Sequence, residues 1–195
     1  MNVRPAGDRG VLIELPDNGA AVSLARALAG RQDLEDVVPG HRTVLVTWPP
    51  GAPRPDLDAL ADDPPAPGAG RGIEIPVVYD GPDLDEAARL TDLSPEEVVA
   101  RHLAPEYVVA FLGFAPGFAY LLGGDPRLEM PRLERPRERV PAGSVAIAGP
   151  YSGVYPRESP GGWRLLGRTS ATLFDPDRDP PALLACGDRV RFVRP

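Results

Sequence analysis

The sequence predicts an α+β protein divided into two domains. Prolines and glycines crowd residues 49–72, and such clusters are typical of a linker or surface loop. Strand and helix patterns alternate before this region, whereas short strand-like runs dominate after it. We therefore expect a small α/β domain in residues 1–72, with the Pro/Gly-rich linker at about 49–72, and a mainly β domain in residues 73–195.

The first domain shows strand, helix, strand, strand and helix patterns in that order. They occupy residues 10–15, 20–28, 37–38, 43–48 and 56–61. The first helix is alanine-rich, Asn18-Gly19 can start it and Gly30 can end it. The βαββα order predicts a ferredoxin-like half-sandwich. His41 lies in the turn after Pro39-Gly40, where we expect a surface residue.

The second domain opens with a strand at residues 73–79, followed by a helix with a strong start signal. Ser94 can cap this helix, Pro95 suits its first position and Glu97 can close a capping box, so the helix should end near Pro105. The remaining strand-like runs are short. They occupy residues 107–112, 145–148, 163–167, 171–174 and 189–193. Many short strands with few helices predict a β-barrel or sandwich.

Composition excludes several classes of function. The formal net charge of −7 disfavours non-specific binding to nucleic acid or an anionic membrane. No apolar run approaches the ~20 residues that span a bilayer, and the first residues lack a signal-peptide core. We expect a cytoplasmic protein that binds neither nucleic acid nor membrane.

Side-chain chemistry narrows the classes further. All 21 positively charged residues are arginine, so a Walker-A lysine or a Schiff-base lysine is excluded. Two histidines and one cysteine cannot build the common zinc sites, and we expect no metal site. Cys186 cannot form an internal disulfide and should be a buried structural thiol.

The segment Gly113-Phe114-Ala115-Pro116-Gly117-Phe118-Ala119-Tyr120-Leu121 is the most informative part of the chain. Its glycines and proline favour a stiff, shaped loop directly after an apolar strand. Such a loop can present its aromatic side chains as a binding wall. The alternative is a tight turn whose phenylalanines complete the core.

Other residues could act in catalysis or binding. His102 lies near the end of the expected helix, where a histidine can act as acid or base or can interact with the last carbonyls. Arginines crowd residues 132–139 and either bind an anion or pair with neighbouring glutamates. Residues 142–144 could offer backbone N–H groups and a hydroxyl to an anion, or form only a turn. Arg168 is the best anion-binding candidate, because Gly167 before it permits close approach of a ligand or a chain segment.

Three stretches together resemble one family. They are the aromatic segment, residues 140–149 with 153–156, and residues 159–169. In this order they resemble the B subunit of 5-oxoprolinase, also labelled allophanate hydrolase subunit 1, a family that includes the kinase inhibitor KipI and a related carboxyltransferase domain of urea carboxylase. The resemblance implies a cyclophilin-like barrel for residues 73–195, carries a histidine at His102 and singles out Arg137 among the arginines. The family commonly has a glutamine where this chain has Tyr151, which puts the substrate in question.

The resemblance implies one component of a bacterial ATP-dependent 5-oxoprolinase, which opens 5-oxo-L-proline to L-glutamate. ATP, accompanied by magnesium, would bind at a site shared with the C subunit, the main partner. The A subunit would also be needed, so that the chain is inactive alone. The resemblance and the residue patterns together indicate His102 as the catalytic residue. The binding residues that they indicate are Phe114, Pro116, Phe118, Arg137, Gly143, Ser144, Tyr155, Ser159 and Arg168.

Two alternative functions follow from the same resemblance. A KipI-like module would inhibit a histidine kinase by binding it through exposed Phe114 and Phe118. A component of an amidohydrolase acting on allophanate would need an amidase centre, and nothing in the chain resembles one with a catalytic lysine.

Overall fold

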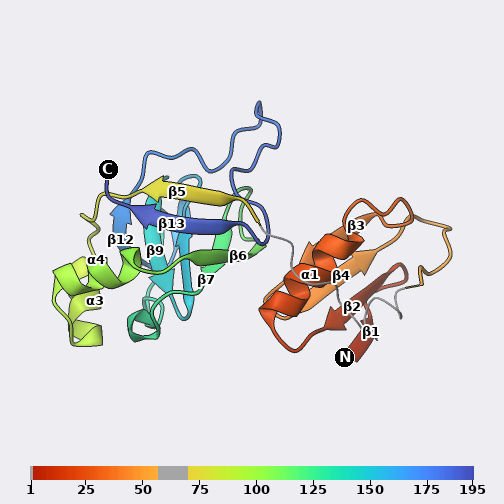
Figure 1. The fold of residues 1–195 in the computed structure, drawn as a ribbon, viewed down its shortest axis with the longest axis horizontal. Helices are drawn as coiled ribbons and strands as arrows, with labels where there is room; N and C mark the ends of the chain where they lie inside the picture. The colour runs from red at the N-terminus through yellow and green to blue at the C-terminus, as the bar shows by residue number, and fades with distance from the viewer. Residues whose placement is uncertain (1, 57–69) are drawn as a thin grey trace. The chain divides into compact units, whose positions relative to one another are not determined.

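The computed structural model describes residues 2–56 and 70–195, which belong to two compact units, Met1–Ala69 and Gly70–Pro195. Their mixture of helices and sheets confirms the predicted α+β class (Figure 1). The helix predicted at residues 56–61 falls almost wholly outside the described residues. No helix in the described ranges is long and apolar enough to cross a membrane.

The first unit is an antiparallel sheet covered by one helix. Its elements are β1 (Asn2–Pro5), β2 (Gly10–Glu14), α1 (Asn18–Leu28), β3 (Asp36–Pro39) and β4 (Thr43–Thr47). The strand order is β1-β2-β4-β3. Asp17 caps α1 by accepting a hydrogen bond from the Ala20 N–H. The buried side chains of Ile13, Leu28 and Val46 form part of one core between the helix and the sheet.

The edge strand β1 was not predicted. Its side chains are largely exposed and include Arg4 and Pro5, so the segment lacks the apolar alternation that marks a half-buried strand. It is held instead by backbone pairing with β2.

The second unit contains two helices of ordinary length, one short 3₁₀ turn (Pro126–Leu128) and nine strands in its described residues. The helices are α3 (Leu84–Thr91) and α4 (Pro95–Leu103), and the strands are β5 (Gly72–Pro76), β6 (Tyr107–Leu112), β7 (Ala119–Leu122), β8 (Arg137–Val140), β9 (Ser144–Ala148), β10 (Tyr151–Val154), β11 (Ser159–Gly161), β12 (Arg164–Arg168) and β13 (Arg189–Val193). The predicted capping box at Ser94 and Glu97 is confirmed, and α4 ends close to the expected position.

Seven strands form one curled sheet in the order β12-β9-β10-β7-β6-β13-β5. The two edges of this sheet meet where Val78, just beyond β5, exchanges two backbone hydrogen bonds of 2.9 and 2.8 Å with Arg168 of β12. A side chain at Gly167 would collide with the Val78 carbonyl, which would lie 2.3 Å from its Cβ. The glycine before Arg168 therefore admits a chain segment, not a ligand, and lets the barrel close.

The barrel interior is filled by apolar side chains from most of its strands, including Val109, Leu121, Val145 and Phe192. The strand predicted at residues 171–174 is wrong: this segment is a loop joined to its surroundings by a single bridge between Phe174 and Ala182. Its apolar run has another cause, because Leu173 is buried in the same barrel core.

Candidate functional site

The loop between β6 and β7 presents aromatic side chains at one end of the barrel sheet. Hydrogen bonds within the loop hold it, with the Gly113 N–H donating to Phe118 O at 3.1 Å and the Phe118 N–H donating to Ala115 O at 2.9 Å. Phe114 has a φ of 68°, in the left-handed region that a phenylalanine rarely adopts. It is nevertheless 59% exposed, and Pro116 is exposed beside it.

Phe118 points the other way and is only 1% exposed. Of the two phenylalanines expected to be exposed, only Phe114 is. Phe118 lies at the centre of an aromatic cluster in edge-on packing, with ring centroids 5.3 Å from Tyr155 and 5.3 Å from Trp163. Phe114 packs on this cluster at 5.4 Å from Phe118. The loop therefore combines the two arrangements considered from the sequence. Phe118 completes the core, and Phe114 is exposed on the surface above it.

A small pocket opens in this aromatic cluster. Its volume is about 100 Å³, and its lining comprises Phe114, Phe118, Tyr120, Arg132, Tyr155, Gly161, Gly162 and Trp163. Ligand sites for drug-sized molecules occupy about 300–1,000 Å³. The aromatic pocket is therefore too small to enclose a nucleotide and has the size for one inserted side chain.

Arg132 supplies the charge at this pocket. Sequence reasoning discounted it in favour of Arg137, but Arg132 is the exposed arginine that lines the aromatic pocket. Burial raises the pKa of the Tyr155 hydroxyl, and the positive charge of Arg132 acts in the opposite direction, as expected for a neighbour. No spacing pattern in the sequence separates Arg132 from the other arginines, because only the course of the loop after Met130 selects it.

Arg137 has a structural partner. Its Nη2 donates to Asp83 Oδ1 at 2.6 Å, and Oδ2 of the same buried carboxylate accepts from the Leu165 N–H at 2.7 Å. The pair ties β8 to the start of α3 and to β12. Asp83 was not singled out in the sequence, where it is one acidic residue among several before α3.

Replacing Asp83 by alanine should lower the free energy of unfolding by about 3 kcal/mol, because Arg137 and the Leu165 N–H lose their common acceptor inside the protein. The exposed pair Arg168–Asp80, at 2.8 Å, provides the control. Asp80→Ala should cost less than about 1 kcal/mol, as exposed ion pairs do. Urea unfolding of both variants measures the difference, and equal losses would contradict the structural assignment of Arg137.

The donors of Gly143 and Ser144, expected to face an anion, are engaged within the protein. The Gly143 N–H donates to Tyr155 O at 2.7 Å and the Ser144 N–H donates to Pro141 O at 3.3 Å. Ser144 Oγ also donates to Pro141 O, at 2.8 Å. These donors already have backbone acceptors, so the segment is a structural turn leading into β9.

Arg168 lies apart from the aromatic pocket. It lines a separate hollow of about 230 Å³ together with Asp80 and Ser144, and its Nε donates to the Asp80 carboxylate at 2.8 Å. Both side chains are exposed. The structure therefore brings Phe114, Phe118 and Tyr155 together but leaves Arg168 with Ser144 in a second place.

Two predicted binding residues carry buried polar atoms that lack a hydrogen-bond partner among residues 2–56 and 70–195. They are Nη1 of Arg137 and Oγ of Ser159. The two residues stand on the paired strands β8 and β11. Buried polar atoms are usually hydrogen-bonded, so these two have capacity for a further acceptor or a bridging water.

His102 lies in the core of the second unit and is fully buried. Its ring stacks on Phe192 with centroids 4.6 Å apart, Nδ1 is 2.7 Å from the Tyr79 hydroxyl and Nε2 is 3.1 Å from Ser152 Oγ. Burial lowers the pKa of His102 to about 3, so the ring is neutral near pH 7. It lines none of the pockets described above, and this geometry favours a structural role over the predicted catalytic one.

Within residues 2–56 and 70–195, no group of three or more histidine, cysteine, aspartate or glutamate side chains could hold a metal ion. Cys186 is half-buried, and its Sγ donates to the Ala110 carbonyl at 3.3 Å. Tyr151 packs edge-on against Tyr120 at 5.4 Å, next to the aromatic pocket.

Comparison with known proteins identifies relatives of this chain. Residues 1–184 match the family described as carboxyltransferase domain, subdomain C and D. The chain is 38% identical to the 5-oxoprolinase B subunit of Haemophilus influenzae, over 99% of this chain and 97% of that protein. It is 54% identical to the 5-oxoprolinase B subunit of Bacillus subtilis over 127 residues, which are 64% of this chain but only 53% of that protein.

A solved structure supports the fold. The crystal structure of TTHA0988 superposes with a TM-score of 0.86 at 43% identity, covering 96% of this chain and 40% of that one. The likeness agrees with a cyclophilin-like barrel in the second unit. The chain therefore corresponds to about half of one curated relative and to less than half of this solved protein.

Proposed function

Because this chain belongs to the family of carboxyltransferase domain subdomains C and D, we propose that it acts as the B subunit of a bacterial 5-oxoprolinase, cleaving 5-oxo-L-proline to L-glutamate together with partner subunits. The observation that carries the proposal is the match over nearly the full length of a relative named as the B subunit of 5-oxoprolinase. The proposed substrate is a lactam, and opening it by water is unfavourable without coupling to another reaction.

We propose that ATP supplies this coupling from a site completed by a partner. The aromatic pocket does not fit a nucleotide by itself. The aromatic pocket of about 100 Å³ is too small, and the chain has no lysine to reach the phosphates. We therefore assign no step at a nucleotide to this chain. Magnesium would accompany the nucleotide at the same completed site.

The aromatic pocket suits a role in assembly. An exposed aromatic side chain beside a pocket of one side chain's size, with an arginine at the edge, is the arrangement of an interface anchor. We propose that the C subunit of 5-oxoprolinase docks on this surface, which we call the Phe114 rim and define as Phe114, Pro116 and Arg132. The A subunit would complete the enzyme. A cytoplasmic location follows from this proposed metabolic role.

Reconstitution tests the proposed function. The purified A and C subunits, mixed with this chain, ATP and 5-oxo-L-proline, should release glutamate, and omission of this chain should reduce the rate to background. The chain alone should release none. Glutamate release that is unchanged by the omission, or turnover by the isolated chain, would contradict the proposal.

The histidine-kinase alternative predicts a different result in the same reconstitution. A KipI-like module would be captured by a kinase dimerisation domain and would give no increase in glutamate release when added to the A and C subunits. The structure supplies one of the two exposed anchors expected for it, since Phe118 is buried.

A further inference from the structure

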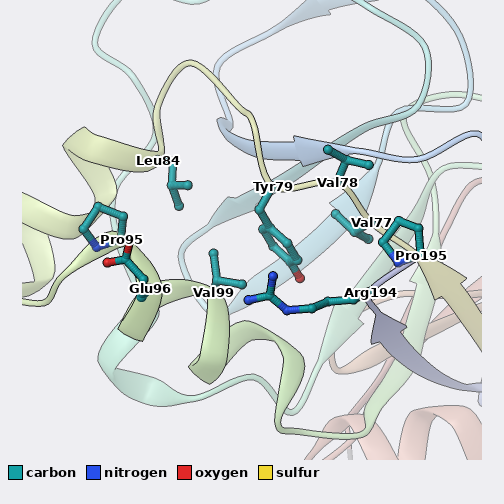
Figure 2. A pocket seen from close by; sticks show the side chains of 9 residues that line it. All are labelled: Val77, Val78, Tyr79, Leu84, Pro95, Glu96, Val99, Arg194 and Pro195. Atoms are coloured by element: carbon teal, nitrogen blue, oxygen red, sulfur yellow. The ribbon is translucent and has the colours of Figure 1, made fainter.

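A third and larger pocket lies away from the Phe114 rim, and nothing in the proposed function uses it. Its volume is about 500 Å³, within the range of small-molecule sites. It is formed by the segment after β5, the first turns of α4, the start of α3 and the last two residues of the chain (Figure 2). The lining residues are Val77, Val78, Tyr79, Leu84, Pro95, Glu96, Val99, Arg194 and Pro195.

The walls of this pocket are mostly apolar. Val78 is among the exposed large hydrophobic residues of the described chain, at 42% exposure, and Leu84 and Val99 face the same space (Figure 2). An apolar wall that remains open to solvent favours a ligand with an apolar body, since contact would remove that surface from water.

Two opposite charges line the same space without meeting each other. Arg194 follows β13, and Glu96 lies in the first turn of α4. Neither side chain forms a hydrogen bond or an ion pair with any residue of the described ranges 2–56 and 70–195. This is unlike the exposed pairs elsewhere, such as Arg168 with Asp80. Among the lining side chains, the pocket therefore presents one positive and one negative charge, Arg194 and Glu96, on mostly apolar walls.

Tyr79 fixes the polar part of the floor. Figure 2 shows the hydroxyl end of its ring next to the Arg194 side chain. Its hydroxyl is held at 2.7 Å from His102 Nδ1, while His102 Nε2 is held by Ser152 Oγ at 3.1 Å. Burial raises the pKa of Tyr79, and Arg194 opposes that shift, so the hydroxyl is neutral and lies within the influence of the guanidinium. A buried chain of hydrogen bonds thus orients this phenol.

We propose that this pocket binds an apolar α-amino acid as its zwitterion. The guanidinium of Arg194 would pair with the carboxylate, the carboxylate of Glu96 would pair with the ammonium, and the valine and leucine walls would take the side chain. A simple fatty acid would leave Glu96 without a partner, and the two carboxylates would repel each other. A simple amine would likewise leave Arg194 without a partner and facing a like charge. The ligand class is independent of the proposed 5-oxoprolinase function.

Calorimetric and NMR titration of the full chain tests the proposal with three probes. They are L-leucine, 4-methylpentanoate, which lacks the ammonium, and 3-methylbutylamine, which lacks the carboxylate. L-leucine should shift the amide signals of Val78 and Val99 and should bind at least tenfold more tightly than either analogue, since each analogue loses one charge-assisted contact. Arg194→Gln and Glu96→Gln should each weaken L-leucine binding at least tenfold.

Arg191→Gln is the matched control, because Arg191 is an exposed arginine of β13 that pairs with Glu106 at 3.4 Å and does not line the pocket. It should leave the affinity unchanged. Because Arg194 and Glu96 are exposed, their replacement should not disturb the core. Thermal unfolding of each variant checks that its stability is unchanged. Absence of signal shifts at Val78 and Val99, or binding of 4-methylpentanoate as tight as that of L-leucine, would overturn the proposal.

Discussion

Replacement of His102 by alanine is expected to lower the free energy of unfolding of the second unit by about 3–5 kcal/mol. The side chain is fully buried, stacks on Phe192, and holds the Tyr79 and Ser152 hydroxyls at its two nitrogens. Alanine removes the packing and leaves both hydroxyls without this partner. Urea unfolding, followed by hydrogen exchange of the β13 amides, measures the loss in the unit concerned.

The same residue should make stability depend on pH. Burial depresses the pKa of folded His102 to about 3, whereas an unfolded histidine titrates near 6.5. Between these values the unfolded chain binds a proton that the folded chain does not, so stability is fully present above pH 6.5 and falls as the pH falls. The expected slope from this residue approaches roughly 1.4 kcal/mol per pH unit. His102→Gln should lack this component of the slope.

His41 supplies the control. It is exposed in the turn between β3 and β4, and His41→Ala should change stability by less than about 0.5 kcal/mol. If His102→Ala kept wild-type stability but abolished glutamate release by the reconstituted enzyme, His102 would be catalytic and its assignment to the core would be refuted.

The helices and strands that could be predicted are those whose sequence pattern lies within a few neighbouring residues. The capping box of α4 joins residues three positions apart, and the alanine-rich run of α1 indicates a helix. Both helices were therefore predicted. Helix α3 was missed although Asp83 precedes it, acidic residues occupy its first turn and Arg89 its last; it is only eight residues long and lacks a capping box. Strands β8 and β11 were missed because they form a small separate sheet of largely polar residues.

The barrel and the site depend on contacts between distant segments. The barrel closes through the pairing of Val78 with Arg168, and no periodic pattern of apolar residues in the sequence predicts that pairing. The same is true of the arginines: Arg132 reaches the aromatic pocket and Arg137 reaches Asp83, although both stand in one charged run. Phe114 and Tyr155, both expected at the site from the sequence, do line one pocket, whereas the partners of each arginine required the three-dimensional arrangement.

Phe114→Gly should weaken binding of this chain to the C subunit of 5-oxoprolinase by about thirtyfold while leaving the chain as stable as before or more stable. The loss reflects removal of an exposed aromatic anchor, for which about 2 kcal/mol is typical. The retained stability reflects the backbone: phenylalanine is held at a φ of 68°, where glycine has no steric penalty. Surface plasmon resonance with the immobilised C subunit and thermal unfolding measure the two effects.

The predicted loss of partner binding distinguishes a loop that docks a partner from a loop that only completes the core. The edge-on packing of Phe114 at 5.4 Å from Phe118 is lost in either case, but if the loop were only a turn that completes the core, Phe114→Gly would leave partner binding unchanged. Leu90→Ala is the matched control, since Leu90 is also a large exposed hydrophobic residue, at 50% exposure, but stands on α3. A docking surface confined to the Phe114 rim requires that Leu90→Ala bind the C subunit like the unmodified chain. Equal weakening by both variants would mean that exposed apolar area in general, and not this strained and displayed ring, mediates the association.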